Sequence, residues 1–298
     1  MKNTHELENK YESPDFFKSA IAINGSITPK VLKQVLIVTL YAVCISVMSL
    51  FFPSLSVAVS PFEYAGLVMG LILVFRVNAG YDRWWEARKT WGSLVNNSRN
   101  LAIIITSYVN KNKQQDIKKL INYIAAMPYL MKNNLRASNS CEDIKHLINQ
   151  DMYQALEAVD HKPNYLSAKI AVLLGELMHS KDLSEFSFLQ AEICREAIID
   201  CQGVSERILK TPMPFVMAVK SRRFILLFLL FLPFALVDYS IYINPLVTAL
   251  VSYALFSLDQ IGVELQNPFS REKLSHLPLD GICQTIESNI MEIHKNAD

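Results

Sequence analysis

The stretch SVAVSPFEYAGLVMGLILVFRVNAGYDRWWEARKTWG, Ser56–Gly92, decides how this sequence folds. Up to Phe75 it is apolar apart from Glu63, and from Val77 onward it holds all three tryptophans of the chain among arginine and lysine residues. A helix of roughly 20 mostly apolar residues crosses the hydrocarbon core of a bilayer. Tryptophan and basic residues gather where such a helix leaves the bilayer. The stretch therefore predicts a membrane-spanning helix followed by its interfacial anchor.

The composition agrees with a membrane protein and excludes several other classes. Hydrophobic residues make up 51% of the 298 residues and charged residues 19%, which is more apolar than a typical soluble domain. A net charge of +1 gives no basic footprint for a nucleic-acid partner. The five cysteines form no CxxC pair, and no metal-binding, phosphate-binding or nucleophile motif is present. We therefore expect no enzyme, no metal and no cofactor.

Four apolar segments are candidates for membrane-spanning helices. They are Val35–Phe52, Ser56–Phe75, Phe224–Val237 and Ile241–Leu258. They come in two close pairs, so each pair predicts a helical hairpin with a tight turn. A buried helix of a soluble core is the alternative for any one segment, above all for the short third one.

The loops between these segments predict the topology. Lysine and arginine flank the hairpins on one side, and the two short connections within the hairpins carry neither residue. The positive-inside rule then places both termini and the middle of the chain in the cytoplasm. The predicted regions are a cytosolic segment at 1–30, hairpins at 31–75 and 224–258, a cytosolic domain at 76–223 and a cytosolic tail at 259–298.

The cytosolic domain is expected to be helical. Apolar residues recur at helical spacing through most of it, and no strand alternation stands out. Pro128 is expected to kink or end the first of these helices. The segments 136–143 and 160–164 are interpreted as loops, and Gly281–His294 as a short helix of the tail. The expected fold is thus an all-α membrane protein with four spanning helices and a helical cytosolic region.

The second apolar segment carries one stripe that combines a carboxylate with large apolar side chains. Glu63, Leu67, Leu71 and Phe75 recur every fourth residue and so lie on one side of a helix. Two interpretations remain open at this point. The stripe can face lipid, with Glu63 at the interface, or it can line a pore formed by several copies of the chain.

Further contacts can be predicted beside this stripe. Gly66 and Gly70 form a pair of small residues that would let a neighbouring helix approach closely. Downstream, Asp82 and Glu86 are expected to pair with nearby basic residues such as Arg83 on the same helix. Both expectations concern structure, not chemistry.

Three motifs together resemble the bestrophin family, and specifically its bacterial branch. They are RVNAGYDRWWEARKTWG at Arg76–Gly92, ERILKTPMPF at Glu206–Phe215 and DQIGVELQNPF at Asp259–Phe269. Their order and spacing against the four apolar segments carry the resemblance, which covers nearly the whole chain. The motif residues to which we assign a structural role are Arg83, Trp84, Trp85, Asn267, Pro268 and Phe269.

The resemblance implies a homopentameric ion channel in the bacterial inner membrane. It implies one central pore for small monovalent ions, with a narrow neck that maps onto Leu67, Leu71 and Phe75. It also implies a cytosolic vestibule with a second aperture, for which Phe186 is the best match. Membrane lipid and the permeant inorganic ions are then the partners besides the chain itself. Members of the family are described chiefly as anion or chloride channels.

The sequence departs from the family in two ways. Animal members have an acidic run after Asn-Pro-Phe that helps to form a calcium clasp, whereas this chain has Ser270–Lys273, so no such clasp is expected. Two of the three neck positions are leucine, whereas the neck of animal members is usually more aromatic. Separately from these departures, five copies of Glu63 at the outer mouth would attract cations, which favours Na⁺ or K⁺ over the anions of the family label. Arg76 is rotated by about 100° from Phe75 and is expected to face protein or the membrane interface. A non-conducting, membrane-tethered helical scaffold is the alternative function.

Overall fold

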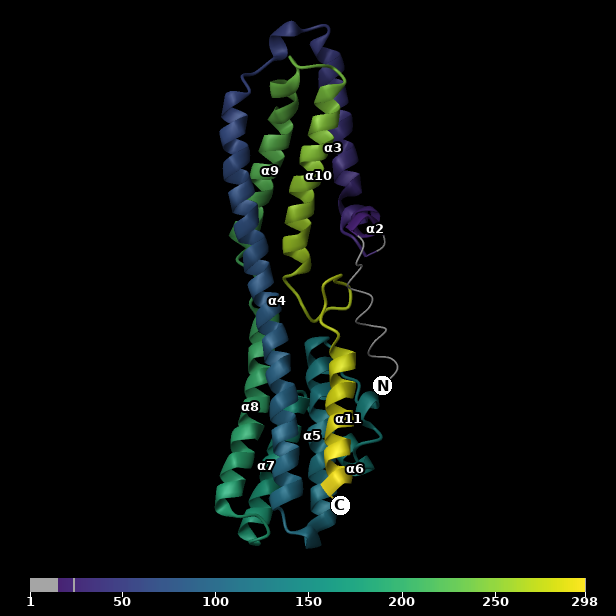
Figure 1. Ribbon diagram of the computed structural model, residues 1–298, viewed down its shortest axis with the longest axis vertical. Helices are drawn as coiled ribbons and strands as arrows, with labels where there is room; N and C mark the ends of the chain where they lie inside the picture. Colours follow the sequence, from purple (N-terminus) through teal and green to yellow (C-terminus); the bar gives the residue numbers. More distant parts are fainter. Residues whose placement is uncertain (1–15, 24, 298) are drawn as a thin grey trace. The chain divides into compact units, whose positions relative to one another are not determined.

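The computed structural model describes residues 16–23 and 25–297, whose regular secondary structure is helix alone, with no strand among them. Of the predicted segment 1–30, residues 1–15 and 24 lie outside this range. The helices are α2 (Phe16–Ile21), α3 (Thr28–Ser49), α4 (Ser60–Tyr108), α5 (Gln114–Leu135), α6 (Gln150–Glu157), α7 (Lys162–His179), α8 (Glu185–Lys210), α9 (Phe215–Leu236), α10 (Ile243–Glu264) and α11 (Leu279–Ala297) (Figure 1). Short 3₁₀ turns lie at Pro53–Leu55, Lys111–Lys113 and Glu142–Ile144.

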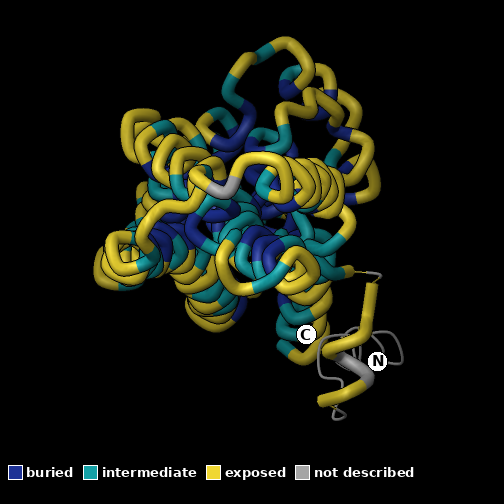
Figure 2. The backbone as a smooth tube through the Cα atoms, turned by 90° about the horizontal axis from the view of Figure 1, so that it is seen from above, coloured by how far each residue is buried: buried dark blue, intermediate teal, exposed yellow. Residues whose placement is uncertain are grey.

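The chain forms two compact units. The first comprises the described chain up to Trp84, Pro212–Pro268 and Glu272–Ser275. The second comprises Trp85–Thr211, Phe269–Arg271 and the chain from His276 onward. Helix α4 therefore gives its first part to one unit and its last part to the other. Along the helices, buried positions alternate with exposed ones (Figure 2).

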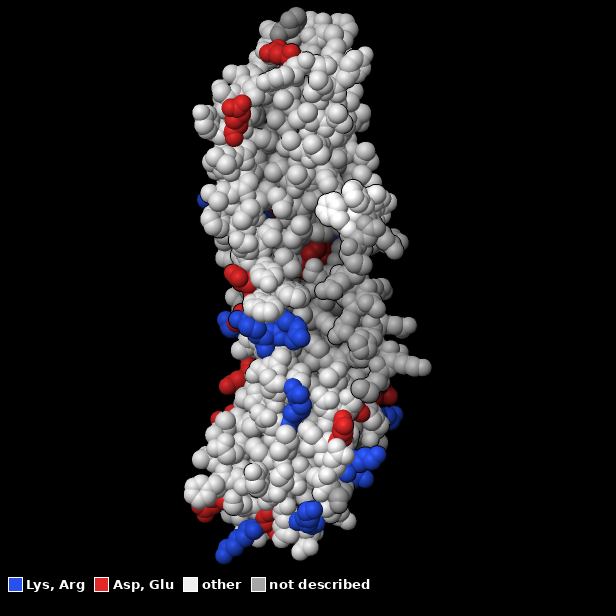
Figure 3. Space-filling model, in the orientation of Figure 1, with Lys and Arg blue, Asp and Glu red and all other residues white. Residues whose placement is uncertain are grey.

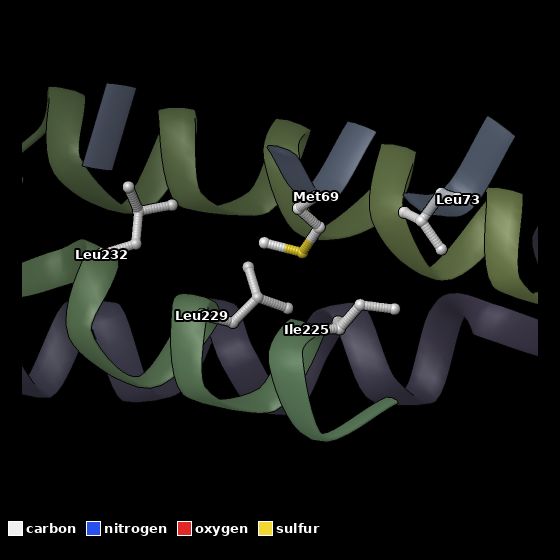
Figure 4. Close-up of a cluster of buried hydrophobic side chains, with 5 residues drawn as sticks. All are labelled: Met69, Leu73, Ile225, Leu229 and Leu232. Carbon is white, nitrogen blue, oxygen red and sulfur yellow. The ribbon is translucent and has the colours of Figure 1, made fainter. Parts of the chain in front are cut away.

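The first unit packs α3, α9 and α10 together with the first part of α4. Its core is a cluster of Met69 and Leu73 from α4 with Ile225, Leu229 and Leu232 from α9 (Figure 4). Side chains of α3 and α10 pack around this cluster. On the face drawn in Figure 3, few charged side chains lie over these four helices. Such an outer surface is suited to lipid and not to water.

Three of these helices are long and apolar enough to cross a membrane, namely α3, α4 and α10. Helix α9 differs because it begins with a basic segment that includes Lys220, Arg222 and Arg223. Its uncharged part, Phe224–Leu236, has only 13 residues (224 to 236). At 1.5 Å per residue, that part covers about 20 Å of a hydrocarbon core that is about 30 Å thick.

A polar seam runs through the interior of the first unit. Asn244, Thr248 and Ser252 recur every fourth residue on α10 and are completely buried. The amide of Asn244 donates to the carbonyl oxygen of Pro233 at 2.9 Å, and Thr248 donates to Asn244 at 3.2 Å. A buried backbone carbonyl needs such a partner where no water reaches it. The seam thus fixes the register of α10 against the end of α9.

The second unit is a bundle in which α5 packs against α7 and α11, and α7 packs against α8. Helix α5 continues through Pro128, so of the two expected outcomes, a kink or an end, the end is wrong. A proline removes one backbone hydrogen bond and costs about 3 kcal/mol in an exposed helix. Here every residue from Ile124 to Met131 is buried, and packing offsets that loss.

Other predicted boundaries shift for local reasons. The expected loop at 160–164 is short, because α7 already begins at Lys162 with Pro163 in its first turn, where a proline needs no donor. The ring of His161 caps this helix by accepting from the backbone N–H of Asn164. The tail helix α11 is longer than the predicted Gly281–His294.

Candidate ion-conducting face

The predicted stripe of α4 lies on the outer surface of the first unit. The exposed fractions are 75% for Leu67, 56% for Leu71 and 60% for Phe75, and Glu63 is exposed on the same side. Met69 and Leu73, which point to the opposite side of the helix, are 4% and 0% exposed. The helix therefore buries one apolar side in its own chain and leaves an equally apolar side uncovered.

The carboxylate of this stripe has a second explanation. Glu63 lies in the first turn of α4, where the partial positive charge of a helix N-terminus favours an acidic side chain. This interaction with the helix N-terminus stabilises Glu63 whether or not the stripe lines a pore. The position of Glu63 alone therefore does not decide which ions this surface would attract.

Arg76, one residue past the stripe, is buried against its own chain. Its side chain is 2% exposed, and its Nη1 lies 2.6 Å from Oδ1 of Asp259 on α10. Nη1 also donates to the carbonyl oxygen of Ala218 at 3.4 Å. The expectation that Arg76 faces protein is confirmed. Arg222 of α9 donates from Nε to Oδ2 of Asp259 at 3.1 Å, so one carboxylate joins α4, α9 and α10.

A close contact between α4 and the end of α10 lies one turn further along. A Cβ atom on Gly80 would sit 3.1 Å from Cβ of Leu265 and 3.3 Å from the carbonyl oxygen of Gly262. A Cβ atom on Gly262 would sit 3.3 Å from the side chain of Arg76. By contrast, a Cβ atom on Gly70 would meet nothing within 4 Å among the described residues. Gly80 and Gly262 are the small residues at this contact, whereas the predicted Gly66 lies against α9, where a Cβ atom would sit 3.6 Å from the ring of Phe228.

Arg83 and Trp84 of the Arg-Trp-Trp motif donate hydrogen bonds to the chain that follows α10. Arg83 donates from Nε and Nη2 to the carbonyl oxygen of Gln266, at 3.3 and 3.2 Å. Trp84 donates from Nε1 to the carbonyl oxygen of Ser275 at 2.7 Å. These bonds hold the chain that follows α10 against α4. The helical spacing suggested a basic partner for Glu86 on its own helix. The structure instead pairs Oε1 of Glu86 with Nη2 of Arg207 on α8, at 2.6 Å.

The three tryptophans have different surroundings. Trp85 is 44% exposed, whereas Trp91 is completely buried in the second unit, where its Nε1 has no hydrogen-bond partner among the described residues. Trp91 therefore contributes to a protein core, and the idea that all three rings form one interfacial anchor is wrong for it. The sequence shows that the rings are close along the chain but not which side of the helix meets protein.

The two other motifs supply the partners of these contacts. Asp259, Gly262 and the carbonyl of Gln266 all belong to DQIGVELQNPF. Asn267 and Pro268 end the first unit's second segment, and Phe269, which is completely buried, belongs to the second unit. There Nε of Arg136 donates to the carbonyl oxygen of Phe269 at 3.2 Å. Sequence reasoning identified this motif but could not assign the partners, which lie up to 183 residues away along the chain.

Glu206 of ERILKTPMPF is the centre of a hydrogen-bond network in the second unit. Its Oε1 accepts from Asn134 at 2.8 Å and Gln202 at 2.6 Å and pairs with His161 at 2.7 Å, and its Oε2 accepts from Lys210 at 3.0 Å. Burial alone would raise the pKa of Glu206, but these hydrogen bonds and the nearby cations lower the pKa to about 2. The ionised carboxylate thus ties α5 and the start of α7 to α8.

The predicted aperture residue is prominently exposed. Phe186 is 86% exposed in the first turn of α8, just after the N-cap Ser184, whose Oγ accepts from the backbone N–H of Ser187. Leu189 and Ile193 continue an exposed apolar stripe along α8, at 57% and 51%. Such a stripe on a helix outside the apolar unit needs either a partner surface or a role that requires exposure.

The described residues contain no group of three or more His, Cys, Asp or Glu side chains that could hold a metal ion. In the run Ser270–Lys273, Arg271 donates to Oδ2 of Asp280 at 2.8 Å. Arg136 and Lys132 bind the same carboxylate at 2.8 and 3.0 Å. Burial alone would raise the pKa of Asp280, but these three cations lower it strongly. The lack of a calcium clasp stays a prediction.

These features define a class of protein. The chain is an all-helical membrane protein with an apolar helical unit, an uncovered apolar stripe on one spanning helix and a separate polar helical unit. The sequence profile described as Bacterial/Fungal Bestrophin protein matches residues 9–292. The chain therefore belongs to the bacterial and fungal bestrophin family.

Relatives and solved structures agree with this family. A "voltage-dependent anion channel-forming protein" of Nostoc is 32% identical over 93% of this chain and 91% of its own length. One of Synechocystis is 30% identical over 90% of this chain and 88% of its own. The crystal structure of a bacterial bestrophin homologue from Klebsiella pneumoniae matches with a TM-score of 0.83, at 25% identity, over 89% of this chain and 98% of that one. None of these comparisons supports the expected preference for cations.

Proposed function

We propose that this chain forms an ion channel in which Leu67, Leu71 and Phe75 line the neck of the pore. The observation that carries the proposal is the uncovered stripe on α4, with exposed fractions of 56–75%. Its side chains are one turn apart and belong to a helix that can span a membrane. An apolar ring of this kind controls ion passage by its width and by dewetting.

The stripe becomes a pore lining only when several copies surround one axis. A single chain has the stripe on its outside, so one copy encloses nothing. A homopentamer is the assembly that the family resemblance implies, and α4 would then face the central axis in every copy. Phe186 is the proposed residue of the second, cytosolic aperture, supported by its exposure in the first turn of α8.

We further propose that α9 is the fourth span and that both termini are cytoplasmic, with the channel in a bacterial inner membrane. The whole of α9 has 22 residues, and its length of about 33 Å matches the bilayer core. The long side chains of Arg222 and Arg223 can extend to the interface while their stems stay in the apolar layer. The basic loops support this orientation.

Anions are the first candidate for the permeant ions, because the relatives are named as anion channel-forming proteins. Cations are the second candidate, favoured by the exposure of Glu63 in line with the neck residues. Arg76 does not favour either sign at the neck, because it is buried and paired with Asp259.

The reversal potential across a planar bilayer in a salt gradient tests both conduction and the sign of the permeant ion. Purified wild type and Glu63→Gln are measured in a KCl gradient, with Asp238→Asn, an exposed acidic residue of the same unit, as the matched control. Cation permeation through an acidic mouth predicts a reversal potential near that of K⁺, which Glu63→Gln shifts toward Cl⁻ while the control does not. A potential near that of Cl⁻ in all three proteins assigns the channel to anions. Absence of current in all three contradicts the channel and favours the non-conducting scaffold.

A further inference from the structure

A groove of about 350 Å³ opens on the first unit where α3, α9 and α10 meet. Its polar lining comes from Gln34, Arg222, Asp259 and Gln260, and its apolar lining includes Leu226 and Phe256. The polar residues lie at the basic end of the apolar helices, because Arg222 lies two residues before the uncharged part of α9. The groove thus changes from charged to apolar over its length.

We propose that this groove binds an anionic phospholipid, with the phosphate at Arg222 and an acyl chain along Leu226 and Phe256. The proposal depends on these helices lying in a membrane but not on ion conduction. It is carried by the combination of one cavity, one available guanidinium group and an uncovered apolar surface beside it.

Arg222 retains the donors that such a phosphate needs. Its side chain is 53% exposed, and only Nε is engaged, in the bond to Asp259. The two terminal nitrogens of Arg222 make no hydrogen bond with any described residue. Arginine binds phosphate well because its planar group offers two parallel donors.

The charge balance around the groove also favours an anion. Arg76 and Arg222 share the single carboxylate of Asp259, which leaves one formal positive charge at this cluster (two arginines and one aspartate). Lys33 and Lys220 are exposed nearby in sequence, and neither has an ion pair within the described part of the chain. Each basic residue close to a membrane surface strengthens binding to anionic lipid.

The apolar part of the groove favours a lipid over a free phosphate ion as the ligand. Leu226 is 61% exposed, and Ile225 beneath it is 2% exposed, so the floor is closed and the rim is open. In a bilayer such an opening is filled by an acyl chain, whereas inorganic phosphate gains nothing from it. An adjacent copy of the chain would instead need to bring a carboxylate to Arg222.

Native mass spectrometry of the delipidated full-length protein tests the proposal. Phosphatidylglycerol and phosphatidylcholine of identical acyl chains are titrated against wild type, Arg222→Gln and Arg223→Gln. Arg223 is the matched control, since it is an equally basic neighbour on α9 that does not line the groove. Loss of one charge-assisted phosphate contact corresponds to about a tenfold change in Kd. We expect wild type to bind phosphatidylglycerol about tenfold more tightly than phosphatidylcholine, and Arg222→Gln to lose this preference while Arg223→Gln keeps it.

A second variant tests the apolar half of the groove. Leu226→Trp fills it and should weaken both lipids several-fold, whereas Leu230→Trp, one turn along α9 and outside the lining, should not. An excess of inorganic phosphate should displace little phosphatidylglycerol. Equal losses in Arg222→Gln and Arg223→Gln, or full displacement by phosphate, would overturn the proposal. So would a change of oligomeric mass in Leu226→Trp without any change in lipid binding, because a second copy would then occupy the groove.

Discussion

Two neighbouring parts of α4 differ in what surrounds them. From Glu63 to Phe75 one side of the helix is apolar and uncovered, and from Arg76 to Trp84 the helix is bound to the rest of its unit by an ion pair, a glycine contact and hydrogen bonds. The exposed side chains of the first part make few contacts within the single chain, so changing them should alter its stability little. The second part is bound to α9, α10 and the chain that follows α10. Under the proposed function, the uncovered side of α4 serves permeation, while its buried side and the residues from Arg76 to Trp84 hold the helix in place.

The largest effect on stability is expected at Asp259. Asp259→Ala leaves Arg76 buried without its carboxylate, and breaking a buried ion pair in this way costs about 3–5 kcal/mol. The purified variant should unfold at a markedly lower temperature than wild type, or fail to accumulate in the membrane. Asp238→Ala removes an exposed carboxylate of the same unit and should unfold like wild type. Equal unfolding temperatures for both variants would contradict the role of this pair.

A smaller loss is expected at Glu206, together with a defined pH dependence. Since the pKa of Glu206 in the folded chain is about 2, below its ordinary value of 4.5, the stabilisation is complete above pH 4.5. It is lost as the pH falls from 4.5 toward 2. Glu206→Gln should lower the free energy of unfolding by about 2 kcal/mol at neutral pH. The difference between wild type and variant should shrink as the pH approaches 2, and thermal unfolding at several pH values measures it.

Alanine substitutions at two glycines should change the free energy of unfolding in opposite directions. Gly80→Ala places a methyl group 3.1 Å from Cβ of Leu265, and overpacking of this kind costs about 1–3 kcal/mol. Gly175→Ala, in the interior of α7, meets nothing within 4 Å and should stabilise the chain by about 0.4–1 kcal/mol. Thermal unfolding in the same detergent compares the two. A Gly80→Ala protein that is as stable as Gly175→Ala means that α4 and α10 are not in close contact there.

The smallest effect on stability is expected for the stripe itself. Leu67→Ala, Leu71→Ala and Phe75→Ala each shorten a side chain that is more than half exposed, so the unfolding temperature should change little. Leu73→Ala, on the buried side of the same helix, should cost about 2–5 kcal/mol and serves as the control. A large loss at the stripe would mean that it packs against another surface and does not border a water-filled path.

Much of the fold follows from the sequence, because the signals that determine it are local. Apolar runs of about 18–20 residues and helical periodicity predict α3, the start of α4 and α10, and the rotation of Leu67, Leu71 and Phe75 onto one side. The orientation of Arg76 away from the stripe also follows from the helix itself, because successive side chains of a helix are 100° apart. These predictions need no knowledge of what lies far away in the chain.

The contacts that hold α4 in place could not be predicted in the same way. Asp259, Gln266 and Ser275 are about 180–190 residues away from their partners, and nothing in one sequence pairs them. Pro128 failed as a helix breaker for a related reason, since the packing that offsets its missing hydrogen bond comes from helices distant in the sequence. The long-range partners decide these features, and periodicity carries no information about them.

Ion flux through purified protein in liposomes tests the central claim most directly. Wild type, the three stripe variants and Leu40→Ala, an exposed apolar residue on α3 in the same unit, are compared at equal protein density. The account predicts that wild type conducts, that each stripe variant changes the flux several-fold without changing the unfolding temperature, and that Leu40→Ala conducts like wild type. Unchanged flux in all three stripe variants beside a conducting wild type would contradict it.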